Sequence, residues 1–497
     1  MYTRAVNERS GAGFRAGKAL LLSILACMAI SFAVGCSGSA PAQEKEEEVT
    51  AETSADRPNI IFVLTDDLDY ASVQRMPNLR SLLVEQGISF ENAFTSQSLC
   101  CPSRATMLTG QYSHNHGVKG NKLPDGGFEK FRDEGHEENS IAARLQEEGY
   151  RTALIGKYFN EYPGDADPTY VPPGWDEWHA KLYEGKVYDY SLNENGEEVS
   201  YGNETEDYLT DVISEKATDF VRGASDGSGK PFFAYVAPTA PHLPAAPAER
   251  HEGEFAYETA PKPPSFNEED VSDKPSWTRD AERLDDEELS EIDDQYRNRL
   301  ESMLAVDEMV GSLVEELEAT GELENTYIIF TSDNGWLGGE HRVKQGKDRP
   351  YEESARVPLY VRGPGVPQGV EMQELVLNTD LAPTFAELGG VEGFEVDGRS
   401  LLPLLHDREP PSWRSAVLLE GFVGRGARVY GAVRTEGRKY VEYGNGEEEL
   451  YDLRNDPYEL ESLHEKADSA LVENLKARLD ALRDCEGDGC REAENGS

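Results

Sequence analysis

An uninterrupted apolar run at residues 59–64 constrains the fold more than any other feature of the sequence. Its β-branched and aromatic side chains do not alternate with polar ones, which is typical of a strand buried on both faces of a parallel sheet. Similar runs lie at 152–155, 232–236, 327–331 and 357–361. Helix-like segments separate them at 76–86, 139–148, 206–221 and 289–320. This alternation predicts an α/β fold with a large mixed, mostly parallel sheet sandwiched by helices.

The last part of the chain has a different pattern. Beyond about residue 410 the predicted strands become shorter, at 416–419, 430–434, 439–443 and 449–452, and a final helix is predicted at 469–483. We therefore predict a large domain at 57–410 and a small C-terminal α+β subdomain at 411–497, with an antiparallel sheet and a terminal helix. Residues 251–290, rich in Pro, Glu and Asp, are expected to form an irregular surface excursion.

The N-terminus has the features of an export signal. Basic residues precede a charge-free run at 19–34, which is short for a membrane span of ~20 residues and suits the apolar region of a signal peptide. Small residues directly before Cys36 are typical of a bacterial lipobox, although Ala33 stands where leucine is usual. We interpret 1–35 as a lipoprotein-type signal peptide and Cys36 as the lipidated residue. A plain secretory signal cut nearby is the alternative.

Residues 36–56 are rich in Ser, Ala, Pro and Glu and are predicted to form a disordered tether between anchor and domain. The protein is therefore expected outside a bacterial membrane, in contact with that membrane only through its lipid. The 48 basic and 95 acidic residues give a net charge of −47, which argues against a nucleic-acid partner. Exposed charges are screened beyond ~8 Å, so a locally basic pocket can still accept an anion.

Polar side chains follow two of the predicted strands directly. Asp66 and Asp67 follow the first strand, and Asp333 and Asn334 follow the strand at 327–331. Open α/β sheets bind ligands at this edge, so the four side chains are expected to meet there. Three carboxylates and an amide oxygen suit Ca²⁺ or Mg²⁺ and do not suit zinc. Either pair alone is more typical of a turn or a helix cap than of a metal site.

A third string runs from Leu99 to Gly110 as Leu-Cys-Cys-Pro-Ser-Arg-Ala-Thr-Met-Leu-Thr-Gly. Pro102 suits the first turn of a helix. Cys100 would then lie at the helix N-terminus, where backbone N–H groups favour an anion. Arg104, one turn later, reaches the same end. A lone cysteine at a helix start is usually structural, but the surrounding string favours a functional one.

The string Cys100-Cys101-Pro102-Ser103-Arg104, followed by Leu108-Thr109-Gly110, resembles the signature of the type I sulfatases in the alkaline-phosphatase-like superfamily. The resemblance extends from Arg57 to about Asp456. The tandem cysteines, the string His114-Asn115-His116 and residues 156–162 are similar to N-acetylglucosamine-6-sulfatases and extracellular heparan 6-sulfatases. The resemblance implies a sulfuric ester hydrolase that acts on a sulfated glycan or an aryl sulfate.

The resemblance implies that a formylglycine-generating enzyme oxidises Cys100 to formylglycine during export. One hydroxyl of the formylglycine hydrate would attack sulfur, and the second would then lose a proton and eliminate sulfate. A serine sulfate would have no such internal route to release. The resemblance also implies a bound calcium ion, in preference to magnesium, held by Asp66, Asp67, Asp333 and Asn334.

The same match implies further catalytic residues. Arg104 would steady the diol, and Lys157 would contact sulfate. His242 and Lys347 would bind sulfate or protonate the leaving oxygen, because a cation beside a leaving alkoxide stabilises it.

Other residues are expected on the sugar side of the site. Phe159 stands where many sulfatases carry a histidine proposed as the base for elimination, so that role is open. His116 is a candidate base, and a substrate-pocket or structural histidine is the alternative. His341 is expected to line the site. A sugar subsite is expected to include Asn160, together with His114, His116 and Glu161.

The remaining cysteines have simpler interpretations. Cys101 is expected to pack beside Cys100, and Cys485 and Cys490 to form a small disulfide in an exported protein. Two other functions share these features: a phosphonate or phosphate ester hydrolase of the same superfamily, and a catalytically silent glycan-binding surface protein.

Overall fold

The computed structural model describes residues 57–496 except 184, 407–412 and 425. The predicted signal peptide, Cys36 and the tether lie outside the described residues. No helix in the described part of the chain is both long enough and apolar enough to cross a membrane.

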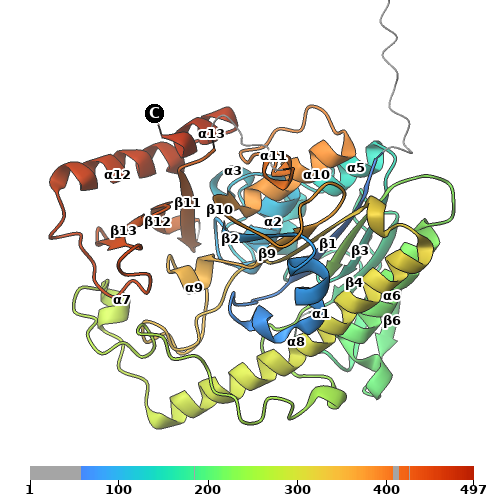
Figure 1. Cartoon of the computed structure of the whole chain (residues 1–497), viewed down its shortest axis with the longest axis horizontal. Coiled ribbons are helices and arrows are strands. Elements are labelled where there is room, and N and C mark those ends of the chain that lie inside the picture. Colours follow the sequence, from blue (N-terminus) through green and yellow to red (C-terminus); the bar gives the residue numbers. More distant parts are fainter. Residues whose placement is uncertain (1–56, 184, 407–412, 425, 497) are drawn as a thin grey trace, which may run out of the picture. The chain divides into compact units, whose positions relative to one another are not determined.

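Ten strands form one sheet in the order β10-β2-β9-β8-β1-β7-β3-β4-β5-β6 (Figure 1). Parallel pairing joins β8, β1, β7, β3 and β4, and also joins β2 to β10, whereas β9, β5 and β6 pair antiparallel with their neighbours. This confirms the mixed, mostly parallel sheet. The strands are β1 (Asn59–Thr65), β2 (Ile88–Phe94), β3 (Arg151–Gly156), β4 (Glu177–Leu182), β5 (Tyr190–Glu194), β6 (Glu197–Tyr201), β7 (Phe232–Ala237), β8 (Thr326–Ser332), β9 (Leu359–Arg362) and β10 (Val370–Leu377).

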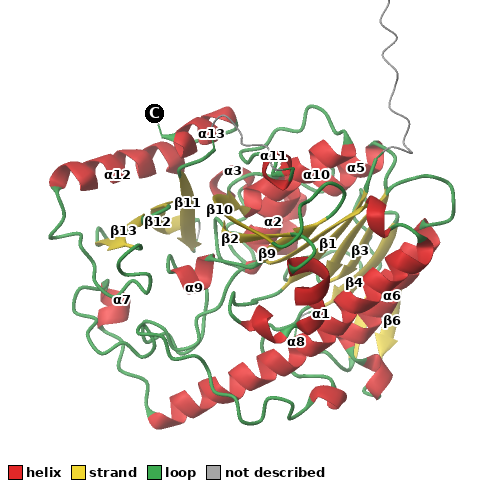
Figure 2. Cartoon of the chain, in the orientation of Figure 1, coloured by secondary structure: helices red, strands yellow, loops and turns green. Residues whose placement is uncertain are grey.

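Helices cover both faces of this sheet, as Figure 2 shows. Strand β1 is fully buried, because Ile60, Phe62 and Leu64 enter one core while Ile61 and Val63 enter the other. The first core is completed by α2 (Cys100–Thr109), α4 (Gly127–Asp133), α5 (Ile141–Glu147), α10 (Leu381–Gly389) and α11 (Leu402–Leu405). The second is completed by α1 (Pro77–Leu79), α6 (Leu209–Ala224) and α8 (Asp286–Thr320).

Several predicted helix bounds shift for local reasons. Helix α8 begins at Asp286, before the predicted 289, because the Asp285 side chain caps it in a capping box with Glu288. Helix α6 begins three residues late, after a short 3-10 turn at Thr205–Asp207. The predicted helix 76–86 is broken into α1 and a π-helical segment at Arg80–Val84, with residues 85 and 86 in the turn before β2.

A second sheet of four antiparallel strands follows, in the order β11-β12-β13-β14, and confirms the predicted small antiparallel sheet. These strands are β11 (Ala416–Val423), β12 (Ala427–Thr435), β13 (Arg438–Tyr443) and β14 (Glu448–Asp452). Their core also contains Phe94 and Leu375 from the large sheet and Leu479 from helix α12 (Ser469–Arg483). A further helix, α13 (Asp488–Asn495), follows the predicted last helix.

The excursion at 251–290 is not confined to the surface as expected. It contains one short helix, α7 (Ser276–Arg279). Its Ser265, Glu268 and Lys274 are buried, and Lys274 forms an ion pair with Glu268. Two more short helices are α3 (Ser113–His116) and α9 (Glu352–Ala355).

Candidate active site

The two polar strand ends lie side by side. Strands β1 and β8 pair in register from Asn59↔Thr326 to Thr65↔Ser332, so both chains leave the sheet at the same edge. The Asp67 N–H donates to Asp333 Oδ1 (3.2 Å), and Asn334 Nδ2 donates to Asp67 Oδ1 (2.7 Å). Asp67 has φ 68°, a left-handed conformation that aspartate tolerates better than most residues. The register therefore brings together the four residues predicted as metal ligands.

Helix α2 points its first residue at this edge. Leu99 is extended, the helix begins at Cys100, and every residue of the helix is buried. The Cys100 Sγ atom lies 3.4 Å from Asp66 Oδ1. One turn along, the fully buried Arg104 donates from Nε to Asp333 Oδ2 at 2.8 Å. The helix thus holds the predicted nucleophile and a guanidinium against the carboxylates.

Three further predicted side chains converge on the same place. Lys157, directly after β3, donates from Nζ to Asp66 Oδ2 at 2.6 Å. Lys347 Nζ lies 2.9 Å from Cys100 Sγ and also contacts Asp67 Oδ1. His242 Nε2 lies 3.8 Å from Asp67 Oδ2. Because His242 Nδ1 donates to the Leu243 carbonyl (2.7 Å), Nε2 carries no hydrogen in the neutral ring.

These contacts set the electrostatics of the cluster. Burial by itself would raise the pKa of Asp66, but the positive charges of Lys157, Arg104 and Lys347 hold that pKa well below its usual value. Burial and the neighbouring Asp66 carboxylate raise the pKa of the Cys100 thiol well above its usual value. Asp66 is therefore ionised, whereas Cys100 as an unmodified thiol is neutral at ordinary pH.

The buried oxygens fit a hard cation. Asp67 Oδ2 and Asn334 Oδ1 are buried and have no hydrogen-bond partner among the described residues. Ligand atoms of Asp66, Asp67, Cys100 and His242 all lie within 4.8 Å of one another. Leaving buried polar oxygens unsatisfied costs roughly 1–3 kcal/mol each, so this arrangement makes sense if a cation binds them. Oxygen donors of this kind favour calcium over zinc.

A cavity of about 50 Å³ opens onto the cluster beside Asp66, Lys157 and His242. Asn160, predicted on the substrate side, lines this cavity. Lys181, near the end of β4, and Tyr183, directly after β4, also line it, and sequence reasoning missed both. No motif marks them, because their place depends on how β4 pairs with β3 and β5.

His341 does not lie in this cavity, contrary to expectation. Its ring is completely buried, donates a hydrogen bond from Nδ1 to Glu268 Oε2 at 3.0 Å, and stacks on the Tyr351 ring with 3.9 Å between ring centroids. His114 is likewise held elsewhere, between the Glu420 carboxylate and the Cys485 carbonyl. His114 and His341 were expected beside the substrate because each follows a site motif in the sequence. The chain turns between the motif and the histidine, so each ring points into the protein interior.

His116 also lies in the interior, with 1% of its surface exposed. Its Nδ1 accepts the Val118 N–H (3.1 Å), so Nε2 is the protonated nitrogen and donates to Thr106 Oγ1 (3.0 Å). Because both ring nitrogens are hydrogen-bonded inside the protein, the geometry favours a structural role for His116 over a role in binding the substrate or as the base for elimination. Burial, together with the nearby His136, holds the pKa of His116 well below its usual value.

We expect His116→Ala to destabilise the protein by roughly 2–4 kcal/mol, because it removes a buried ring and two hydrogen bonds. Sugar and aryl sulfate turnover should both change less than about threefold in the folded protein. Below pH ~6.5 the unfolded chain gains a proton at His116 that the folded protein does not, so wild-type stability falls as pH falls. The stability gap between the two proteins should therefore narrow from pH 8 to pH 5 in thermal or urea unfolding. A selective loss on the sugar would contradict this assignment.

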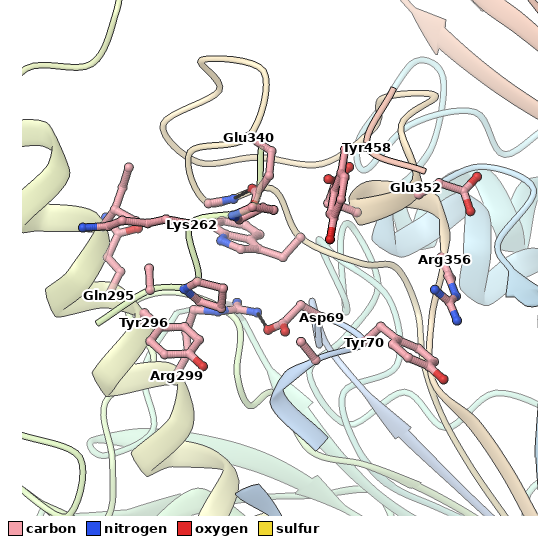
Figure 3. A pocket seen from close by; sticks show the side chains of 18 of the residues that line it. Asp69, Tyr70, Lys262, Gln295, Tyr296, Arg299, Glu340, Glu352, Arg356 and Tyr458 are labelled. Atoms are coloured by element: carbon pink, nitrogen blue, oxygen red, sulfur yellow. Dashed lines mark hydrogen bonds and ion pairs between the residues drawn. The ribbon is translucent and has the colours of Figure 1, made fainter. Parts of the chain in front are cut away.

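A larger cavity, of about 530 Å³, lies beyond the metal-ligand loops (Figure 3). Its lining includes Asp69 and Trp336, each two residues beyond a predicted ligand, and Arg299 of α8. Arg299 donates to the Asp67 carbonyl (2.6 Å) and to Asp69 Oδ2 (3.2 Å), so this residue fastens the Asp66–Asp67 loop from behind. The cavity contains none of the residues around Cys100.

The structure also places the other cysteines of residues 57–496. Cys101 points away from the cluster, into the core, where its Sγ accepts the Asn160 N–H at 3.2 Å. Cys485 and Cys490 are bonded to each other in the structure.

Comparisons with known proteins agree with this geometry. A sulfatase family model matches residues 58–391, and a model of the C-terminal part of N-sulphoglucosamine sulphohydrolases matches 339–485. The N-acetylglucosamine-6-sulfatase of Homo sapiens is 35% identical over 478 residues, which cover 88% of this chain and 86% of that protein.

Two further proteins are similar. A putative extracellular sulfatase Sulf-1 homolog of Caenorhabditis elegans is 38% identical over 375 residues; these cover 73% of this chain but only 52% of that protein, about half its length. A solved structure of a protein in complex with its substrate D-glucosamine-2-N,6-O-disulfate has a TM-score of 0.73 and 26% identity, and covers 89% of this chain and 99% of its own.

Proposed function

The chain belongs to the sulfatase family and is a sulfuric ester hydrolase, and we propose that its substrate is a sulfated sugar carrying a 6-O-sulfate on N-acetylglucosamine. The observation that supports hydrolysis of a sulfate ester is the convergence on Cys100 of an acidic, oxygen-rich cluster and the cationic side chains of Arg104, Lys157 and Lys347. Asp66 and Lys347 approach its sulfur within 3.4 and 2.9 Å, and Lys157 joins them through Asp66.

We propose that Cys100 functions as formylglycine, made by a formylglycine-generating enzyme, and that Asp66, Asp67, Asp333 and Asn334 hold calcium rather than magnesium. The formylglycine hydrate would supply a nucleophilic hydroxyl, and the calcium ion would polarise a sulfate oxygen. The partnerless oxygens of Asp67 and Asn334 support the calcium assignment. The position of Cys100 at a buried helix start supports the first assignment.

The surrounding residues have separable roles. Lys157, at the inner end of the small cavity, would bind a sulfate oxygen. Arg104 is fixed to Asp333 and would hold the nucleophile's oxygen and not the sugar. His242, whose Nε2 faces the cluster, would hold a proton for the leaving oxygen, and Lys347 would stabilise the charge on that oxygen.

The substrate proposal rests on relatives named as N-acetylglucosamine-6-sulfatases and on the glucosamine disulfate bound by the solved relative. Asn160 supports it from this chain, since its buried amide lines the cavity and can hydrogen-bond a sugar hydroxyl or acetamido group. A site built on such bonds rejects analogues that lack them.

We expect kcat/KM for 6-O-sulfated N-acetylglucosamine to exceed that for its 3-O-sulfated and galactose isomers by at least about 10²-fold, because misplaced hydroxyls leave buried polar groups unpaired. Sulfate release from a panel of sulfated monosaccharides measures this. Good turnover of another sulfated sugar with none of any 6-O-sulfated hexosamine would refute the substrate. Faster hydrolysis of aryl phosphonates than of every sulfate ester would favour a phosphonate ester hydrolase. Binding of glycans without turnover would favour a catalytically silent glycan-binding protein.

We further propose that the protein is exported and lipid-anchored at Cys36, outside a bacterial membrane. The charge-free run at 19–34 and the small residues before Cys36 support this, and so does the name of the extracellular relative. Fractionation of membranes from cells expressing the wild type or Cys36→Ser tests the anchor, since only the wild type should stay with the membrane.

A further inference from the structure

Tyr183 has an unusual backbone at the mouth of the small cavity. It directly follows β4 and has φ 58°, a left-handed conformation that aromatic residues rarely adopt. Such a conformation costs on the order of 1–2 kcal/mol. The Tyr183 side chain is 59% exposed, so burial of its ring offsets little of that cost.

Two hydrogen bonds hold Tyr183 in this conformation. Its N–H donates to the Tyr162 carbonyl at 3.2 Å, and its carbonyl accepts from Lys181 Nζ at 2.5 Å. Lys181 is 7% exposed, so a largely buried ammonium group is committed to the backbone of an exposed tyrosine. Strained residues that the surroundings hold so firmly cluster at ligand-binding sites. The arrangement presents the ring to solvent beside the cavity.

The cavity is too small for a whole sugar. Its volume of about 50 Å³ holds only a few water-sized groups, at roughly 10–15 Å³ each, which suits a sulfate group. Lys157, Asp66 and His242 line this space, so the sulfate would occupy it. The sugar ring attached to that sulfate must then lie at the mouth of the cavity, where Tyr183 stands.

We propose that Tyr183 is a substrate-binding platform on which the apolar face of the sugar ring stacks, and that Lys181 is the residue that positions it. This inference rests on the proposed sugar sulfatase function. A pyranose offers one face of C–H groups, and an aromatic ring combines a broad apolar face with a negative π-cloud that attracts them. The platform therefore gives affinity for a sugar and none for free sulfate.

The test compares Tyr183→Leu and Tyr183→Phe in the full-length protein. Leucine keeps an apolar side chain but removes the ring, so KM for 6-O-sulfated N-acetylglucosamine should rise about 3- to 10-fold with kcat nearly unchanged. Phenylalanine keeps the ring and should stay within about twofold of wild type. Inhibition by inorganic sulfate, which fills only the cavity, should be unchanged in both. Tyr257→Leu, at a fully exposed tyrosine outside the cavity lining, is the matched control.

Lys181→Met tests the positioning role. It should raise KM for the sugar sulfate in the wild-type background, and should add little in the Tyr183→Leu background, because both changes remove the same platform. Fully additive effects would show that Lys181 acts independently of Tyr183 and would overturn this part.

Binding calorimetry with the inactive Cys100→Ala protein tests the Tyr183 platform separately from the proposed sulfatase function, because it measures sugar sulfate affinity without turnover. The sugar sulfate should bind 3- to 10-fold more weakly when Tyr183→Leu is added, whether or not the wild type turns it over. An unchanged sugar affinity, or an equal loss for inorganic sulfate, would overturn the platform while leaving the sulfatase function intact. Absence of turnover with the expected affinity change would count against the proposed function alone.

Discussion

Replacing Cys100 with alanine is expected to lower kcat/KM for sulfate esters at least about 10³-fold, whereas Cys101→Ala should keep most of the activity. The two side chains point in opposite directions from the start of α2. The sulfur of Cys100 lies between Asp66 and Lys347, and the sulfur of Cys101 packs in the core against the Asn160 N–H. Adjacent residues on a helix face different ways, so only one of the pair can reach the substrate.

Mass spectrometry of the tryptic peptide completes the test. Protein from a host with a formylglycine-generating enzyme should have lost the sulfur at Cys100 and kept it at Cys101. Cys100→Ser is the matched control, since a serine hydroxyl has no second hydroxyl to expel sulfate and should release at most one equivalent of product. Equal activities of Cys100→Ala and Cys101→Ala, or an unmodified Cys100 in fully active protein, would disprove the assignment.

The central strands were predictable because burial on both faces leaves a strong sequence signal. The run at 59–64 and those at 152–155, 232–236 and 327–331 correspond to four adjacent parallel strands. Strands β2, β4 and β10 were missed because polar residues interrupt them and leave no continuous apolar run. The same holds for β5 and β6. The Asn195-Gly196 turn between them was a usable hairpin signal.

The site was predictable to the extent that its residues follow strand ends. The register of β1 against β8 brings Asp67 beside Asn334 without help from the rest of the fold. His341 was misplaced because it lies in an irregular loop, and a positive φ of 50° at this residue turns the chain there. Tyr183 left no signal, since its exposure depends on a buried lysine two residues earlier.

The charges of the cluster explain why a cation matters. Asp66, Asp67 and Asp333 supply three negative charges, and Arg104, Lys157 and Lys347 supply three positive ones, all within one set of contacts. The cluster by itself is thus close to neutral and offers little attraction to a sulfate ester, in a protein of net charge −47. A bound divalent ion would add two positive charges where the substrate binds, and would be only weakly screened there.

Asp67→Asn should therefore abolish calcium binding and turnover together. The side chain keeps its shape and loses one charge, which should weaken calcium binding at least about 100-fold, because affinity in oxygen sites follows ligand charge. Loss of the ion should lower kcat/KM at least about 10³-fold, since metal polarisation is worth several kcal/mol. Elemental analysis and calorimetry of purified protein measure the ion directly, without reference to activity.

Thermal unfolding gives an independent measure of the same site. Calcium at 100 times its Kd should stabilise the wild type by about 2.7 kcal/mol and leave Asp67→Asn almost unchanged. Asp69→Asn is the matched control, because Asp69 lies two residues further along the same loop, pairs with Arg299 and is absent from the cluster around Cys100. It should keep the calcium response. An equal calcium response in Asp67→Asn would mean that the cation lies elsewhere, whereas zinc bound at these residues would refute the assignment of calcium to the site.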